Sequence, residues 1–216
     1  MINTILQITK LDPELLNEIK DSFNDLPETE HADGAYRLRK YSRVIADLKE
    51  LLKGTKVRAL IGNEFRQSEQ YNKHQGDVTR TFENIDDPFI SSEAMRLLVL
   101  AFYNACKLSG EHEFDVHQLR IKCEGGATQI SPEGWHQDGY DHIAIIGIDR
   151  INIIGGEILL SGSKTDAPFF TAILETGTMV ILNDNFLWHN ARAIQPIEDS
   201  EPAWMDVMVF TLRDRT

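Results

Sequence analysis

The stretch Trp135-His136-Gln137-Asp138-Gly139-Tyr140 decides what fold and chemistry we expect of this chain. If residues 135–146 form a β-strand, His136 and Asp138 project from one face with their Cα atoms roughly 6.5 to 7 Å apart. Such a pair can bind one metal ion. An isolated H-x-D pattern is more often a polar strand end beside a turn, so the support has to come from the rest of the chain.

A third ligand is expected from Trp188-His189-Asn190. His142 lies six residues after His136 and would be about 20 Å away on the same extended strand, so it cannot share the ion. His189 follows an apolar segment and a turn, which allows it to return to His136 from another strand. Two imidazoles and one carboxylate are typical of non-haem Fe(II) centres that handle O2. A packing role for His189 is the alternative.

Length and composition indicate one globular domain. The chain has 216 residues, 42% of them apolar and 26% charged, which suits a single folded unit. The first residues lack a signal-peptide pattern, and no apolar run reaches the about 18 to 20 residues that span a bilayer. We therefore expect a cytoplasmic protein with no membrane partner. Cys106 and Cys123 are too few for a disulfide framework and are expected to be reduced packing thiols.

The charge balance disfavours nucleic acid as a partner. The net charge is −12, which repels a phosphate backbone unless a local basic patch overrides it. A small basic cluster does occur at residues 37–43. Arg37, Arg39 and Tyr41 in this cluster are candidates for binding the carboxylate of a small-molecule substrate. A solvated strand or helix face is the alternative reading, and the oligomeric state stays open.

Hydrophobic periodicity and turn signals predict an α+β fold. Helices are expected from Asp12-Pro13 to Pro27, over residues 45–52, and from Ser91 or Ser92 to about Leu108. Strands are expected at 35–43, 57–65, 78–85, 114–123, 135–148, 151–160, 168–175, 178–183, 186–194 and 204–213. Helices followed by about seven strands indicate a sandwich or jelly roll that encloses a pocket.

Within this single domain, 1–216, residues 1–34 are expected to form an N-terminal helical extension. Residues 114–216 are expected to form the metal-binding jelly-roll core. No nucleophile elbow, phosphate-binding loop or dinucleotide fingerprint follows a predicted strand, so hydrolase and nucleotide-binding functions have no support.

Several motifs, taken in order, resemble one known family. They are Arg37-x-Arg39-x-Tyr41-Ser42-Arg43, Phe65-x-Gln67-Ser68-x-x-Tyr71-Asn72, Gly76-x-Val78-x-Arg80-x-Phe82, His117-Gln118-Leu119-Arg120, His136-x-Asp138, Gly155-Gly156-Glu157, and His189 followed by Ala203-Trp204-Met205-Asp206-Val207. Together they cover roughly residues 35–216. They are similar to the Fe(II)/2-oxoglutarate dioxygenases that hydroxylate free aliphatic amino acids, of the L-isoleucine dioxygenase type.

The resemblance implies a double-stranded β-helix, a cupin-like jelly roll with N-terminal helices packed on one sheet. It also implies that His136, Asp138 and His189 bind Fe(II), and that 2-oxoglutarate and O2 are co-substrates. The expected reaction is hydroxylation, or another oxidation, of an unactivated C–H bond in a free amino acid or a similar small molecule. Because Asp138 is present, a halogenase is disfavoured.

One position departs from the family pattern. Where the family has an arginine for the distal carboxylate of 2-oxoglutarate, this chain has Met205. A thioether cannot replace a two-pronged guanidinium. Either Arg192 or Arg120 is expected to bind the co-substrate instead, or 2-oxoglutarate is not used.

Three alternative functions therefore stay open at this point. The pattern also fits an Fe(II) oxygenase or oxidase that does not use 2-oxoglutarate, and a non-catalytic cupin-like module that binds a metal or a small acid. A demethylase of nucleic acid or protein is the third, and the net charge of −12 disfavours it.

Overall fold

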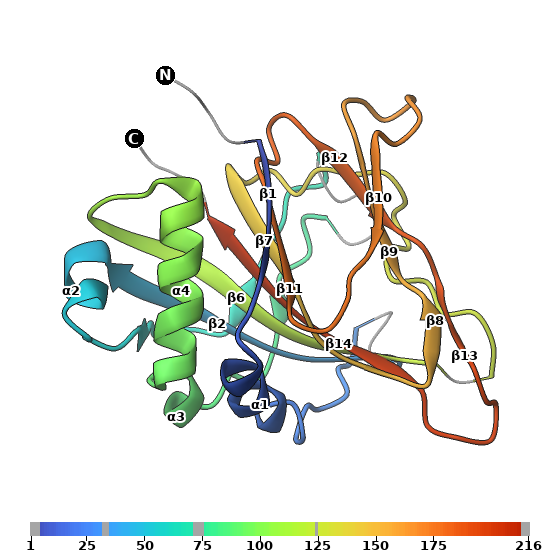
Figure 1. The fold of residues 1–216 in the computed structure, drawn as a ribbon, viewed down its shortest axis with the longest axis horizontal. Coiled ribbons are helices and arrows are strands. Elements are labelled where there is room, and N and C mark those ends of the chain that lie inside the picture. The colour runs from blue at the N-terminus through green and yellow to red at the C-terminus, as the bar shows by residue number, and fades with distance from the viewer. Residues whose placement is uncertain (1–4, 32–34, 71–75, 124, 213–216) are drawn as a thin grey trace.

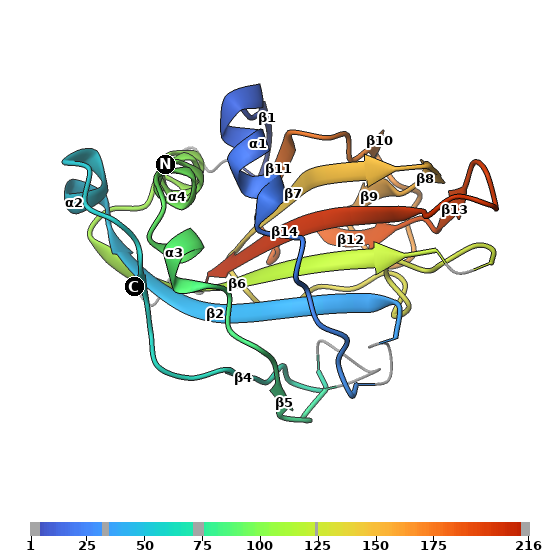
Figure 2. The ribbon, with the colours of Figure 1, turned by 90° about the horizontal axis from the view of Figure 1, so that it is seen from below.

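A seven-stranded antiparallel sheet forms the centre of the protein, in a computed structural model that describes residues 5–31, 35–70, 76–123 and 125–212. The strand order is β1-β11-β7-β14-β6-β2-β3. The strands are β1 (Leu6–Lys10), β2 (Arg37–Asp47), β3 (Arg58–Ala59), β6 (Glu111–Lys122), β7 (His142–Ile151), β11 (Thr178–Leu182) and β14 (Trp204–Leu212). Figure 2 shows β2, β6, β14 and β7 running side by side.

A smaller three-stranded sheet lies on one side of the large sheet, away from the helices (Figure 1). Its order is β10 (Phe170–Ile173), β9 (Glu157–Ser161) and β12 (Trp188–Ala191). Two short pairs complete the strands: β13 (Ile194–Pro196) with β8 (Ile153–Gly155), and β4 (Glu64–Phe65) with β5 (Arg80–Thr81).

Four helices cover the other face of the large sheet: α1 (Pro13–Asp21), α2 (Leu48–Leu52), α3 (Asp87–Ile90) and α4 (Glu93–Cys106) (Figure 1). The side chain of Ser92 caps α4 by accepting the N–H of Met95 at 3.1 Å. Met95, Leu98 and Phe102 form a fully buried stripe at helical spacing. The predicted helices at 13 and 93 are thus confirmed. Across the described residues, no helix has the length and apolar character needed to cross a bilayer.

The two faces of strand β14 pack into two different hydrophobic clusters. Met208 and Phe210 pack into the helix-side cluster, whereas Met205 and Val207 pack into the cluster that faces the small sheet. Side chains alternate along a strand, so both faces of β14 are apolar. The space between the two sheets is therefore lined by the odd-numbered residues of β14.

The predicted strand over residues 135–148 begins too early. β7 starts at His142, and the preceding residues form a loop in which His136 makes only an isolated bridge. Gly134 and Gly139 adopt positive φ angles of 71° and 80°, which an extended strand excludes. His136 and Asp138 are therefore placed by a loop, and the two-residue strand spacing does not apply.

Other boundaries differ for physical reasons that act over long distances. Residues 45–47 continue β2, because they pair with the start of β6, so the helix predicted from 45 begins only at Leu48. The strands predicted at 57–65 and 78–85 shrink to two-residue pieces. Strand β1 was not predicted, and it forms by pairing with β11.

Candidate metal centre

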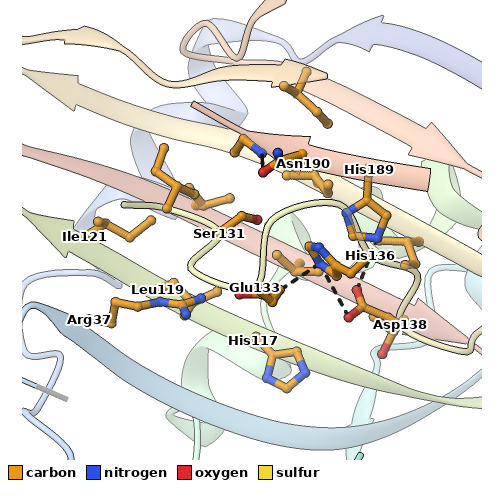
Figure 3. Close-up of a pocket in the computed structure, with 18 of the residues that line it drawn as sticks. Arg37, His117, Leu119, Ile121, Ser131, Glu133, His136, Asp138, His189 and Asn190 are labelled. Atoms are coloured by element: carbon orange, nitrogen blue, oxygen red, sulfur yellow. Dashed lines mark hydrogen bonds and ion pairs between the residues drawn. The ribbon is translucent and has the colours of Figure 1, made fainter. Parts of the chain in front are cut away.

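His136, Asp138 and His189 come together at one end of the space between the sheets. One ligand atom of each lies within 4.8 Å of the others. Figure 3 shows His136 and Asp138 on the loop before β7, and His189 on β12, all pointing toward a common point. Both histidines are buried. The sequence predicted this group, and the fold assembles it from the loop and β12.

Backbone hydrogen bonds fix the two histidines relative to each other. The N–H of His136 donates to the carbonyl of His189 at 3.1 Å, and the N–H of His189 donates back at 3.0 Å. The ring centroids lie 4.1 Å apart. The separation of the imidazoles is therefore set by the main chain.

Side-chain partners orient the ligands. Nδ1 of His136 lies 2.8 Å from the carbonyl oxygen of Gly134, so Nδ1 carries the proton and Nε2 keeps its lone pair for a metal. The amide of Gln67 donates to Oδ1 of Asp138 at 2.7 Å. This contact leaves Oδ2 of Asp138 directed at His189, with a distance of 3.5 Å to Nε2.

A second acidic residue, Asp184, lies beside this group. Its Oδ1 is buried, 3.2 Å from Nε2 of His189. Its Oδ2 accepts the backbone N–H of Gly139 at 2.8 Å and that of Tyr140 at 3.3 Å. Asp184 therefore ties the loop that carries Asp138 to the segment that leads into His189.

The pKa shifts of the three residues reflect burial and the charges of their neighbours. Burial opposes ionisation of Asp138, but His189, His136 and the Gln67 hydrogen bond outweigh it and lower its pKa. Burial also opposes protonation of His189, but Asp184 and Asp138 outweigh it and raise its pKa. Burial and the nearby His189 lower the pKa of His136. An ionised Asp138 beside a neutral His136 offers the protonation states that a metal ion needs in its ligands.

The group borders a cavity of about 170 Å³ between the two sheets. Most of its wall is apolar, from Leu119, Ile121, Ile130, Ile143, Ile145, Ile158, Leu174, Met205, Val207 and Val209. Its size is below the roughly 300 to 1,000 Å³ of pockets for drug-sized ligands. Small molecules therefore fit this cavity best.

Three arginines line the cavity: Arg37, Arg39 and Arg80. The guanidinium of Arg39 lies 4.4 Å from the ring centroid of Phe82, and its Nη2 approaches Nδ1 of His117 to 2.6 Å. Burial and the neighbouring Arg39 hold the pKa of His117 well below its usual value, so His117 is neutral and Nδ1 accepts. Arg37 and Arg39 thus lie where the sequence predicted a carboxylate site, and the substrate role stays a prediction.

Two arginines predicted to bind a co-substrate lie elsewhere. Arg120 is absent from the cavity wall and makes a bidentate pair with Asp206, with both N···O distances 2.7 Å. It alternates with the cavity-facing Leu119 and Ile121, so it points to the opposite face of β6. The side chain of Arg192 is 60% exposed and lies 3.9 Å from Glu157. Neither arginine is among the residues that line the cavity.

Tyr41 is also displaced from the predicted substrate contact. It is buried beside His117 with ring centroids 4.9 Å apart, and its hydroxyl donates to Asp115 at 2.6 Å. It is not among the residues that line the cavity, so it supports His117 from behind. Tyr71 and Asn72, part of the family-like motif, lie outside the described residues.

Sequence reasoning did not assign four residues that lie at the site or next to it. Glu133 and Arg80 line the cavity, Asp184 contacts His189, and Arg150 contacts Met205. Glu133 Oε1 lies 3.4 Å from Nε2 of His136. The three-residue spacing of Glu133 and His136 was the available signal for it, and Arg80 stood in a family-like motif. Asp184 had been interpreted as part of a turn. Nothing in the sequence pointed to Arg150, because the face of the sheet on which its side chain lies depends on a local irregularity in the pairing of β7 and β14.

The donor set fits Fe(II). Two imidazole nitrogens and one carboxylate leave coordination positions open, as in non-haem iron centres that use O2. The carboxylates of Glu133 and Asp184 add negative charge nearby. Cysteine thiolates alone would favour zinc or an iron–sulfur cluster, and carbonyl oxygens alone would favour magnesium or calcium.

Comparison with known proteins agrees with this chemistry. A family model described as 2OG-Fe dioxygenase matches residues 20–211. The chain is 25% identical over 192 residues to L-isoleucine-4-hydroxylase of Bacillus thuringiensis, which covers 83% of this chain and 76% of that protein.

Solved structures are also similar. A bsmA homologue from Methylobium petroleophilum superposes with a TM-score of 0.78 and 24% identity, over 94% of this chain and 82% of the other. IDO from Bacillus thuringiensis gives 0.73 and 18%, over 97% and 91%. The predicted jelly-roll fold is confirmed.

Proposed function

The chain belongs to the 2OG-Fe dioxygenase family, and from that premise we propose that it hydroxylates an unactivated C–H bond of a free amino acid. The expected cofactors, Fe(II), 2-oxoglutarate and O2, are those of the family. The single observation that carries the proposal is the group His136, Asp138 and His189 at the wall of a small cavity. We assign Fe(II) binding to these three residues.

The proposed reaction balances as follows. The substrate C–H, 2-oxoglutarate and O2 give the substrate C–OH, succinate and CO2. Bound Fe(II) supplies the oxidising chemistry, and the protein supplies position and the exclusion of water.

The residues of this chain suit an amino-acid substrate. We propose that Arg37, Arg39 and Arg80 attract its carboxylate, since a guanidinium offers two parallel donors to a carboxylate. Glu133, whose carboxylate borders the same cavity, is the candidate for its ammonium group. The apolar wall formed by residues such as Leu119 and Val207 then contacts an aliphatic side chain and keeps water away.

Three further observations support the proposal of a small substrate and a reducing compartment. The cavity of about 170 Å³ suits a free amino acid better than a polymer, and the relative with 25% identity is named for isoleucine hydroxylation. Cys106 and Cys123 are both free thiols, which suits the cytoplasm.

The test is a reconstitution with Fe(II), ascorbate, 2-oxoglutarate and a panel of free amino acids. Succinate should form in proportion to an amino acid that gains one oxygen atom, as measured by mass spectrometry. His136→Ala is the matched variant and should form neither product. If the wild-type protein oxygenates no amino acid of the panel, the proposed substrate class is wrong. If it also forms no succinate, the assigned reaction is wrong.

A further inference from the structure

Met205 leaves the wall of the cavity without a cation at the position where the family-like motif has an arginine. Met205 is 1% exposed and lines the cavity from β14. A methionine sulfur is only a weak acceptor and cannot pair with a carboxylate. A dicarboxylate that binds at Met205 therefore needs a positive charge from another strand.

A β-bulge brings that charge from β7. The pairing of β14 with β7 shifts between Asp206 and Val207, so that Val207 faces Gly147 and Met205 faces Arg150. Without this shift, the residue opposite Met205 would be Asp149. Residues directly opposite each other share a face of an antiparallel sheet, and bulges redirect side chains in this way. Arg150 therefore lies on the same face of the sheet as Met205. It is not itself among the residues that line the cavity, but it contacts Met205 and lies against Gly156, which both line it.

The contacts of Arg150 agree with this placement. Its Nη1 lies 3.8 Å from Sδ of Met205, and its Nη2 donates to the carbonyl oxygen of Gly155 at 2.7 Å. One nitrogen is thus anchored by the main chain. The other nitrogen, Nη1, lies against the thioether of Met205, which occupies the position where the family pattern has an arginine.

Gly156 packs closely against the guanidinium of Arg150. A Cβ at this glycine would lie 3.0 Å from Nη1 of Arg150 and 3.4 Å from Sδ of Met205, and Gly156 itself lines the cavity. A side chain at this position would therefore crowd the guanidinium, and glycine lets a cavity-lining residue pack directly beside Arg150.

Arg150 also carries its charge with little compensation. None of the ion pairs found between described residues includes it. Burial lowers its pKa, and the more distant Glu175 and Glu157 only partly oppose this effect. A half-buried cation whose contacts are a carbonyl and a thioether is stabilised by an incoming anion.

We infer that Arg150 binds the distal carboxylate of 2-oxoglutarate, in place of the arginine that Met205 has replaced. The inference rests on the proposed function, since it takes 2-oxoglutarate as the co-substrate. Arg37, Arg39 and Arg80 line another part of the cavity wall, on β2 and β5, and are left for the substrate.

The experiment measures binding without turnover. Protein loaded with Fe(II) is titrated under anaerobic conditions with 2-oxoglutarate, and with 2-oxopentanoate, which has a methyl group in place of the distal carboxylate. The absorption change on chelation of Fe(II) by the 2-oxo acid gives each Kd. Wild type, Arg150→Gln and the control Arg58→Gln are compared. Arg58 is an exposed arginine 3.8 Å from Glu111.

Arg150→Gln should bind 2-oxoglutarate about 10- to 100-fold more weakly, the factor expected for a charged hydrogen bond. Its affinity for 2-oxopentanoate should be unchanged, which also shows that the variant is folded and holds iron. Arg58→Gln should match the wild type. A double variant, Arg150→Met with Met205→Arg, should recover part of the lost affinity.

The outcomes separate the two proposals. If Arg150→Gln keeps the wild-type preference for 2-oxoglutarate, the inference about Arg150 is overturned and the proposed function stands. If the iron-loaded wild type binds neither 2-oxo acid, the proposed function fails first. If both ligands weaken equally in Arg150→Gln, Arg150 only supports the cavity wall and the inference is also overturned.

Discussion

His136 and His189 face each other across a reciprocal pair of backbone hydrogen bonds, 3.1 Å and 3.0 Å long. Because the main chain sets their separation, a metal ion needs only small side-chain movements to bind both rings. The two imidazoles are therefore held close to the positions that metal binding requires.

Metal binding should therefore stabilise the folded protein strongly. At a free Mn(II) concentration of one hundred times Kd, the free energy of unfolding should rise by about 2.7 kcal/mol, because the unfolded chain lacks the site. Thermal unfolding with and without Mn(II) measures this. His136→Ala should lose the response. His112→Ala, which removes a histidine outside the group, should retain it, and a response that survives in His136→Ala would contradict the assigned ligands.

Gln67 should affect metal affinity without touching the ion. Its amide orients the Asp138 carboxylate through a 2.7 Å hydrogen bond, and loss of such a partner typically weakens metal binding about 10- to 100-fold. Gln67→Leu should show this loss in a Mn(II) titration. Gln70→Leu, a change at an exposed glutamine, should not. Equal affinities in the two variants would show that Asp138 is oriented by other contacts.

Asp184 should stabilise the loop that carries Asp138. Asp184→Ala removes the acceptor of the Gly139 N–H and should lower the free energy of unfolding by about 1 to 3 kcal/mol. Asp184→Asn keeps an acceptor oxygen and should recover most of that loss. Denaturant unfolding of both variants measures the difference. If alanine and asparagine are equally destabilising, the negative charge of Asp184 is what stabilises the loop.

His117 should make stability fall in mildly acidic solution. Burial, followed by Arg39, Arg80 and Arg37, holds its folded-state pKa well below 6.5. In the unfolded chain the pKa is about 6.5, so below that pH the unfolded state binds a proton that the folded state does not. Stability is thus fully present above pH 6.5 and is lost as the pH falls toward the folded-state pKa.

Between pH 7.5 and 5.5, this histidine should cost about 1 kcal/mol of unfolding free energy. His117→Gln has no charge to gain and keeps an oxygen that can accept from Arg39. The difference between the wild-type and His117→Gln losses isolates the effect from the other histidines. No difference would mean that His117 is protonated in the folded protein.

The sequence predicted the parts of the protein that depend on local pattern. The Ser92 cap and the buried stripe of α4 were readable from spacing, and so was the pairing of H-x-D with a later histidine. The loop that holds His136 could not be predicted from residue spacing. Its conformation depends on Gly134, Gly139 and the carboxylate of Asp184, which is far away in the chain, so local alternation gave a strand there.

The positions of the arginines depend on alternation and pairing within the sheet. Arg120 was expected at the co-substrate, yet alternation along β6 directs its side chain to Asp206. Arg150 was passed over because its facing follows from pairing between two strands, which no periodicity within one strand reveals.

The bulge beside Asp206 has a consequence for how proteins of this kind are compared. A sequence alignment compares residues position by position. At the position of Met205, such a comparison indicates that the cation of the family pattern has been lost. In space the cation is still there, 3.8 Å away on the neighbouring strand. A guanidinium can thus reach this place from a neighbouring strand, and a motif search that demands an arginine at the position of Met205 would miss it.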